Sequence, residues 1–187
     1  MKKNLLFLTS MLFVSLLFSC KNEKKSDTEN LPVKEDIKVK ENFNVEITAS
    51  SSKKDDFAVY FTENNSIDFK SEDAVWNGMK GANGDENLYF ELTEDRIPTN
   101  IRLDLGLNKD QDSVTIKTVK VNYLTKSFQF NGNDFFTYFN KDEQFTSKIN
   151  DADKSITFYK TGAEYKTPYF YPTPLNNDKV KEITTRN

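Results

Sequence analysis

The chain has 187 residues, with 26 lysines and arginines against 29 aspartates and glutamates, a formal net charge of −3, one cysteine and no histidine. This balance lacks the basic footprint of a nucleic-acid-binding protein, so we expect no nucleic-acid partner. The absence of histidine removes the usual base of serine and cysteine nucleophiles and a common zinc ligand, and a single cysteine excludes a disulfide within the chain.

The first segment, residues 1–19, combines two lysines near the start with an apolar run that is short for a bilayer span. It leads into Leu17-Phe18-Ser19-Cys20, and we interpret residues 1–19 as a signal peptide. The Leu-x-Ser-Cys ending resembles the lipobox of bacterial lipoproteins. That resemblance implies cleavage before Cys20 and a lipid on its sulfur, which would attach the protein to the membrane of the cell envelope. We expect the protein to be attached to the outer membrane, and the sequence does not indicate whether it faces the periplasm or the cell surface.

The next segment, residues 20–41, is charged and contains one proline. It has too few large apolar side chains to bury a core of its own, so we expect a flexible tether.

From residue 42 to residue 187 the pattern changes to alternation of apolar and polar residues, which is typical of half-buried strands. Turn-forming clusters separate the alternating runs. We therefore predict an all-β domain over 42–187, an antiparallel two-sheet sandwich of the jelly-roll type. The alternating positions are Phe43, Val45, Ile47, Ala49; Phe57, Val59, Phe61; Leu88, Phe90, Leu92; Ile101, Leu103, Leu105, Leu107; Val114, Ile116; Phe128, Phe130; and Ile156, Phe158.

Two local features interrupt this pattern. Val119 and Val121 have the opposite parity to Val114 and Ile116, which predicts one extra residue, a β-bulge or bend, near Lys117-Thr118. The phenylalanines within 134–140 have helical spacing, which predicts a short helix there, capped by Asn133 or Asp134 and covering one open end of the sandwich.

Aromatic residues at positions expected to face away from the core are the first candidate ligand-binding residues. Such rings bind sugars, because C–H groups of the sugar pack on the π surface. The alternative is that the rings fill the second face of the sandwich or plug its end. The candidates are Trp76, Tyr89, Tyr169 and Tyr171, and Tyr60 alternates in the same way.

Arg102 and Asp104 share the polar face of one predicted strand and are further candidates for ligand binding. Arginine offers a fork of donors that suits a carboxylate or a pair of sugar hydroxyls, and the alternative is an ordinary ion pair.

Acidic residues suggest two other kinds of site. The first is a calcium site, for which oxygen ligands are offered by Asp104, Asn108, Asp110 and Asp112. A hairpin turn with acidic flanks explains these residues equally well. We expect no other cofactor and no catalytic residue. A pair of carboxylates beside a cleft would suit glycoside hydrolysis.

The run from Leu92 to Phe145 is similar to β-sandwich segments of bacterial cell-surface and membrane proteins, some of them linked to polysaccharide synthesis. The similarity lies in Ile97-Pro98, in Ile101 to Gly106, in Val114 to Lys117 and in Phe135 to Asn140. It implies a sandwich fold and a surface context.

Three functional hypotheses follow. The first is a lipid-anchored, non-enzymatic binding module that recognises glycan. The second is a structural or assembly lipoprotein that docks onto another envelope protein. The third is a carboxylate-based glycoside hydrolase.

Overall fold

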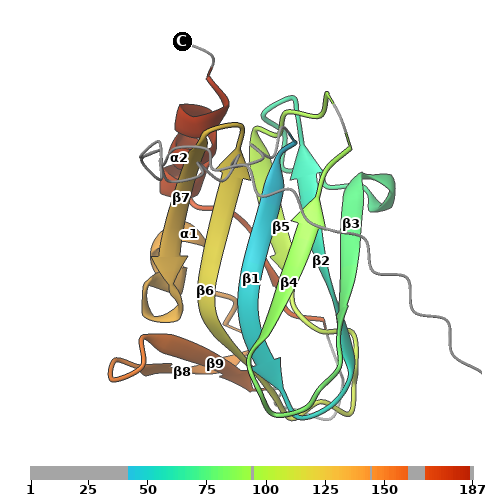
Figure 1. The fold of residues 1–187 in the computed structure, drawn as a ribbon, viewed down its shortest axis with the longest axis vertical. Coiled ribbons are helices and arrows are strands. Elements are labelled where there is room, and N and C mark those ends of the chain that lie inside the picture. Colours follow the sequence, from blue (N-terminus) through green and yellow to red (C-terminus); the bar gives the residue numbers. More distant parts are fainter. Residues whose placement is uncertain (1–41, 94, 144, 160–166, 186–187) are drawn as a thin grey trace, which may run out of the picture. The chain divides into compact units, whose positions relative to one another are not determined.

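The computed structural model describes residues 42–93, 95–143, 145–159 and 167–185 (Figure 1). The predicted signal peptide, the predicted lipidation site Cys20 and the predicted tether lie outside these residues.

The described strands are β1 (Asn44–Ser51), β2 (Asp55–Thr62), β3 (Ala74–Met79), β4 (Glu86–Glu91), β5 (Asn100–Asp104), β6 (Ser113–Tyr123), β7 (Lys126–Asn131), β8 (Thr146–Asn150), β9 (Ser155–Tyr159) and β10 (Tyr169–Phe170). The helices are α1 (Phe135–Tyr138), α2 (Pro174–Thr184) and the 3-10 turns η1 (Ser71–Asp73) and η2 (Gly132–Asp134).

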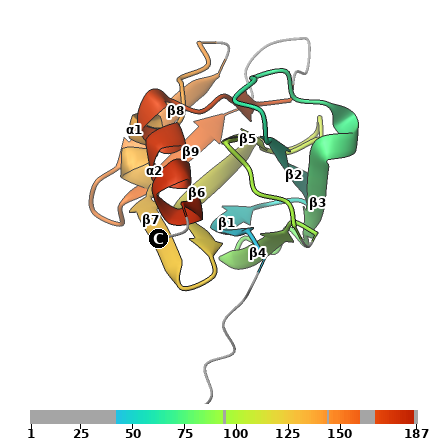
Figure 2. The same ribbon diagram turned by 90° about the horizontal axis from the view of Figure 1, so that it is seen from above.

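The described strands form two antiparallel sheets that face each other as layers (Figures 1 and 2). The large sheet has the order β4-β1-β6-β9-β8, with β7 also pairing with β6, and the small sheet has the order β10-β5-β2-β3. The prediction of an all-β, two-sheet antiparallel sandwich is confirmed.

The space between the sheets is filled by the alternating apolar positions, as expected from burial of one face of each strand. Leu107 is the exception, since 43% of it is exposed. The reason is local: β5 ends at Asp104, and Gly106 then adopts a left-handed backbone with φ of 82° that turns the chain out of the sheet. The predicted inward position of Leu107 is therefore wrong.

The predicted bulge in β6 is confirmed. Thr48 of β1 pairs with Thr118, but the next residue, Ala49, pairs with Ile116, so Lys117 is the extra residue. The bulge marks a change of neighbour, because β9 pairs with β6 before Lys117 and β7 pairs with it afterwards.

The predicted helix over 134–140 is present but begins and ends two residues earlier, and its first turn is the 3-10 turn η2, followed by the single α-helical turn α1. Phe135 and Phe139 bury their rings in the core. The predicted side-chain cap is wrong, since Asp134 is the N-cap residue of α1 but its side chain accepts no capping hydrogen bond.

The longer helix α2 is not among the sequence predictions. It begins at Pro174, whose fixed φ suits the first turn, and Thr173 Oγ1 accepts a hydrogen bond of 3.3 Å from Asn176 N. Val180 and Ile183 are buried against the core, so α2 closes the side of the sandwich beside β7 (Figure 2).

Candidate functional site

The outer surface of the small sheet gathers most of the predicted binding residues, because strand pairing places them in one row. Tyr169 pairs with Asp104, Asp104 with Ala58, and Ala58 with Trp76. Directly paired residues point to the same side of a sheet, and Phe170 next to Tyr169 is in the core, so this row faces outward. Trp76 and Tyr169 stand at its two ends, about 14 Å apart at the usual strand spacing.

The neighbouring row brings the guanidinium group of Arg102 against four aromatic rings. The guanidinium carbon lies 4.1 Å from the ring centre of Tyr60, 5.3 Å from those of Phe69 and Tyr169, and 5.6 Å from that of Tyr171. These distances are within the range of cation–π attraction, which strengthens when the cation is shielded from water.

The same guanidinium group forms a two-pronged ion pair with Asp104. Nε and Nη2 of Arg102 donate to the two carboxylate oxygens, each over 2.8 Å, and the two side chains are only 13% and 8% exposed. Burial raises the pKa of the Asp104 carboxyl, and the hydrogen bonds from Arg102 oppose that rise. Burial by itself would lower the pKa of Arg102. The hydrogen bonds and charge interactions with Asp104 and Tyr171 exceed that effect, so the pKa of Arg102 is raised.

Ring contacts extend this arrangement across the sheet. Tyr60 meets Trp76 edge-on, with ring centres 6.2 Å apart, and Tyr171 contacts both Phe69 and Tyr169 at 5.8 and 6.3 Å. Trp76 is 47% exposed and Tyr169 is 40% exposed. We call this set the aromatic face: Tyr60, Phe69, Trp76, Arg102, Asp104, Tyr169 and Tyr171.

The structure thus brings together Trp76, Arg102, Asp104, Tyr169 and Tyr171, but it does not bring Tyr89 to them. Tyr89 lies on β4 of the large sheet, where Glu46 is its partner on β1. Burial, followed by the nearby carboxylate of Glu91, raises the pKa of Tyr89 to about 12.

Two members of the aromatic face are not among the candidate binding residues chosen from the sequence. The alternation of Tyr60 did indicate an outward side chain, as noted above, whereas nothing in the sequence indicated Phe69. Phe69 lies in the loop between β2 and η1, where no alternation exists to indicate the direction of its side chain.

Two of the four residues considered for calcium, Asp104 and Asn108, have side-chain oxygens that accept hydrogen bonds within the protein. Asp104 is engaged by Arg102, while Asn108 N donates to Asp55 Oδ1 over 2.7 Å and Asp110 N donates to Asn108 Oδ1 over 2.9 Å. The bond from Asp110 N to Asn108 Oδ1 is typical of an Asx turn. Over the described ranges, no group of three or more acidic, histidine or cysteine side chains is arranged to hold a metal ion.

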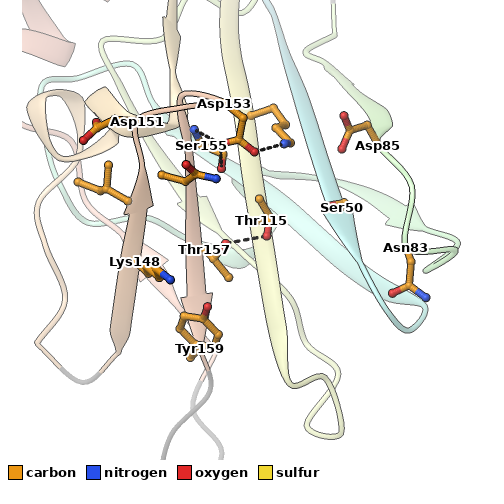
Figure 3. Close-up of a pocket in the computed structure, with 13 residues that line it drawn as sticks. Ser50, Asn83, Asp85, Thr115, Lys148, Asp151, Asp153, Ser155, Thr157 and Tyr159 are labelled. Atoms are coloured by element: carbon orange, nitrogen blue, oxygen red, sulfur yellow. Dashed lines mark hydrogen bonds and ion pairs between the residues drawn. The ribbon is translucent and has the colours of Figure 1, made fainter.

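A polar hollow of about 590 Å³ lies on the opposite side of the molecule, over β6, β8 and β9 of the large sheet (Figure 3). Lys117 Nζ donates to Asp153 Oδ2 over 2.7 Å, Ser155 Oγ donates to Asp153 Oδ1 over 2.6 Å, and the hydroxyls of Thr115 and Thr157 are 2.8 Å apart (Figure 3). The bonds from Lys117 and Ser155 lower the pKa of the Asp153 carboxyl.

A smaller hollow of about 180 Å³ adjoins the loop that carries Phe69. Arg96 dominates it, donating to Glu63 over 2.7 Å and to Asp73 over 3.0 Å, so its charge is already paired.

No known protein family, curated protein or solved structure was found to match this chain. Among the residues that the structure describes, no helix has the length and apolar character needed to cross a membrane.

Proposed function

We propose that this chain is a lipid-anchored binding module of the cell envelope and that its aromatic face recognises glycan. One observation carries the proposal: four rings pack around an arginine that is paired with Asp104, while Trp76 and Tyr169 keep nearly half of their surface exposed on either side.

The exposed rings are the binding elements in this proposal. A sugar ring presents C–H groups that pack on an aromatic face, and rings already fixed in position lose little entropy when the ligand binds. Arg102 and Asp104 are too buried to provide the main contacts with hydroxyl groups. Their part is to hold Tyr60, Tyr169 and Tyr171 in place, so they are positioning residues.

The membrane attachment and the envelope location in this proposal rest on the sequence Leu17-Phe18-Ser19-Cys20. A lipid on Cys20 would keep the binding module close to the membrane surface.

Retention of the full chain on immobilised polysaccharides, together with a glycan array, tests the proposal. We expect at least one glycan to be retained, and we expect Trp76→Ala and Tyr169→Ala each to weaken retention by about thirtyfold, because truncating a hot-spot side chain costs about 2 kcal/mol of binding free energy. Tyr159→Ala is the matched control, because Tyr159 is 38% exposed but lies on the large sheet.

An absence of glycan binding would contradict the proposal. Recovery of one stoichiometric protein from solubilised envelopes, lost in Trp76→Ala, would instead support docking onto another envelope protein.

A further inference from the structure

We infer that the ligand of the aromatic face is an uncharged, extended glycan that lies across the strands from Trp76 to Tyr169. This inference rests on the proposed function and adds the chemical class and the direction of the ligand.

The direction follows from the size of the residues around Trp76. Its neighbours on the same face of β3 are Ala74 and Gly78, and its partner on β2 is Ala58. No ring follows Trp76 along β3, so a ligand running along that strand would gain a single stacking contact. A ligand running across the strands spans the buried residues Ala58 and Asp104, which lie between the two exposed rings, and reaches Tyr169, which gives it two stacking contacts.

The absence of charge on the ligand follows first from the state of Arg102. Asp104 takes the Nε and Nη2 donors of this guanidinium, Tyr171 is a further hydrogen-bond partner, and the surrounding rings leave only 13% of the Arg102 side chain exposed. A carboxylate, sulfate or phosphate group on a sugar would therefore not find the paired donors by which arginine recognises anions.

The surroundings of the face also disfavour anions. The loop over residues 63–73, which contributes Phe69, carries Glu63, Asp68, Glu72 and Asp73 against the single lysine Lys70. Two of these acids pair with Arg96, and Asp56 adds a further exposed carboxylate at the start of β2. An anionic polymer would be repelled by this excess of carboxylates at low ionic strength.

Matched pairs of polysaccharides test the charge of the ligand. Hydroxyethylcellulose is compared with carboxymethylcellulose, fully methyl-esterified pectin with de-esterified pectin, and chitin with chitosan, each at low and high ionic strength. We expect the full chain to retain a neutral member of these pairs about tenfold more tightly than its charged counterpart, with little dependence on salt. We also expect Asp68→Asn combined with Glu72→Gln to raise retention on the acidic members and to leave the neutral ones unchanged.

Tighter retention of an acidic member, or salt-sensitive retention of chitosan alone, would overturn the inference while leaving glycan recognition intact. Failure to bind any glycan would remove the proposed function and the inference together.

The direction is tested with an oligosaccharide series of increasing length from the glycan that is retained. Affinity should rise with length until the chain reaches both rings, and Tyr169→Ala should abolish that rise while preserving the affinity for the shortest members. An unchanged length dependence in Tyr169→Ala would contradict the crossing direction.

Discussion

Arg102 and Asp104, two residues apart on β5, are joined by two hydrogen bonds of 2.8 Å. Their charges are thereby compensated beneath a layer of aromatic rings. Because the ion pair is buried, removal of one partner alone should affect the stability of the fold as well as the shape of the aromatic face.

Arg102→Met should lower the free energy of unfolding by about 3 kcal/mol, because it leaves the Asp104 carboxyl buried without its partner. Urea denaturation measures this loss. The combined variant with Asp104→Leu should recover most of it, since no buried charge then remains. If Arg102→Met were as stable as the wild type, the ion pair would be exposed to solvent and the premise that it is buried would be wrong.

Tyr89 should titrate late at alkaline pH. Its pKa is about 12 in the folded chain against an ordinary 10.0, because burial and the carboxylates of Glu91 and Glu46 disfavour the phenolate. The raised pKa means that Tyr89 adds stability below pH 10.0, and that this contribution is lost as the pH rises towards 12. Absorbance titration of the tyrosines should show a late step that Tyr89→Phe removes. A titration unchanged by that substitution would contradict the assignment.

Glu86 should make the fold sensitive to acid. Its carboxylate accepts hydrogen bonds from the backbone N–H groups of Lys80 and Gly81, which lower its pKa below the ordinary 4.5. A lowered pKa contributes stability above pH 4.5 that is lost as the pH falls through the folded value. We expect Glu86→Gln to flatten the acid side of the profile of stability against pH. Urea midpoints measured at several acidic pH values test this expectation. If the stability of Glu86→Gln falls with acid as steeply as that of the wild type, Glu86 does not have this role.

Asn176 lies fully buried in the first turn of α2, and neither end of its side-chain amide has a hydrogen-bond partner within the described residues. Such a group costs folding energy, so Asn176→Leu should raise the free energy of unfolding by about 1 kcal/mol. Asn176→Asp should lower it, because a carboxylate at this position would be buried without a partner. Thermal and urea denaturation compare the three proteins, and a loss of stability in the leucine variant would contradict the expectation.

The strands were predictable where alternation was long enough to define one buried face, as from Phe43 to Ala49. The opposite parities of Ile116 and Val119 also sufficed to place the bulge, because a change of parity cannot be absorbed without an extra residue. In contrast, β3 is short and contains Gly78, so its pattern is weak. The start of α2 did carry a signal in Thr173-Pro174, but it lies beside aromatic residues that suggested a binding cluster.

The composition of the aromatic face was predictable only in part. Parity shows which residues of a strand share a face, and it correctly grouped Arg102 with Asp104. It does not show which sheet a strand joins, and for that reason Tyr89 appeared equivalent to Trp76. The contact of Phe69 with Arg102 depends on how a loop folds back over the sheet, which local patterns do not contain.

Trp76 is the only tryptophan of the chain, so its fluorescence reports directly on the aromatic face. Titration of the full chain with a retained neutral glycan is the most direct measurement of glycan recognition by this face. We predict a saturable blue shift of the tryptophan emission, because a stacked sugar displaces water from the indole ring. Saturable binding of the same glycan with no change in the emission of Trp76 would contradict the account.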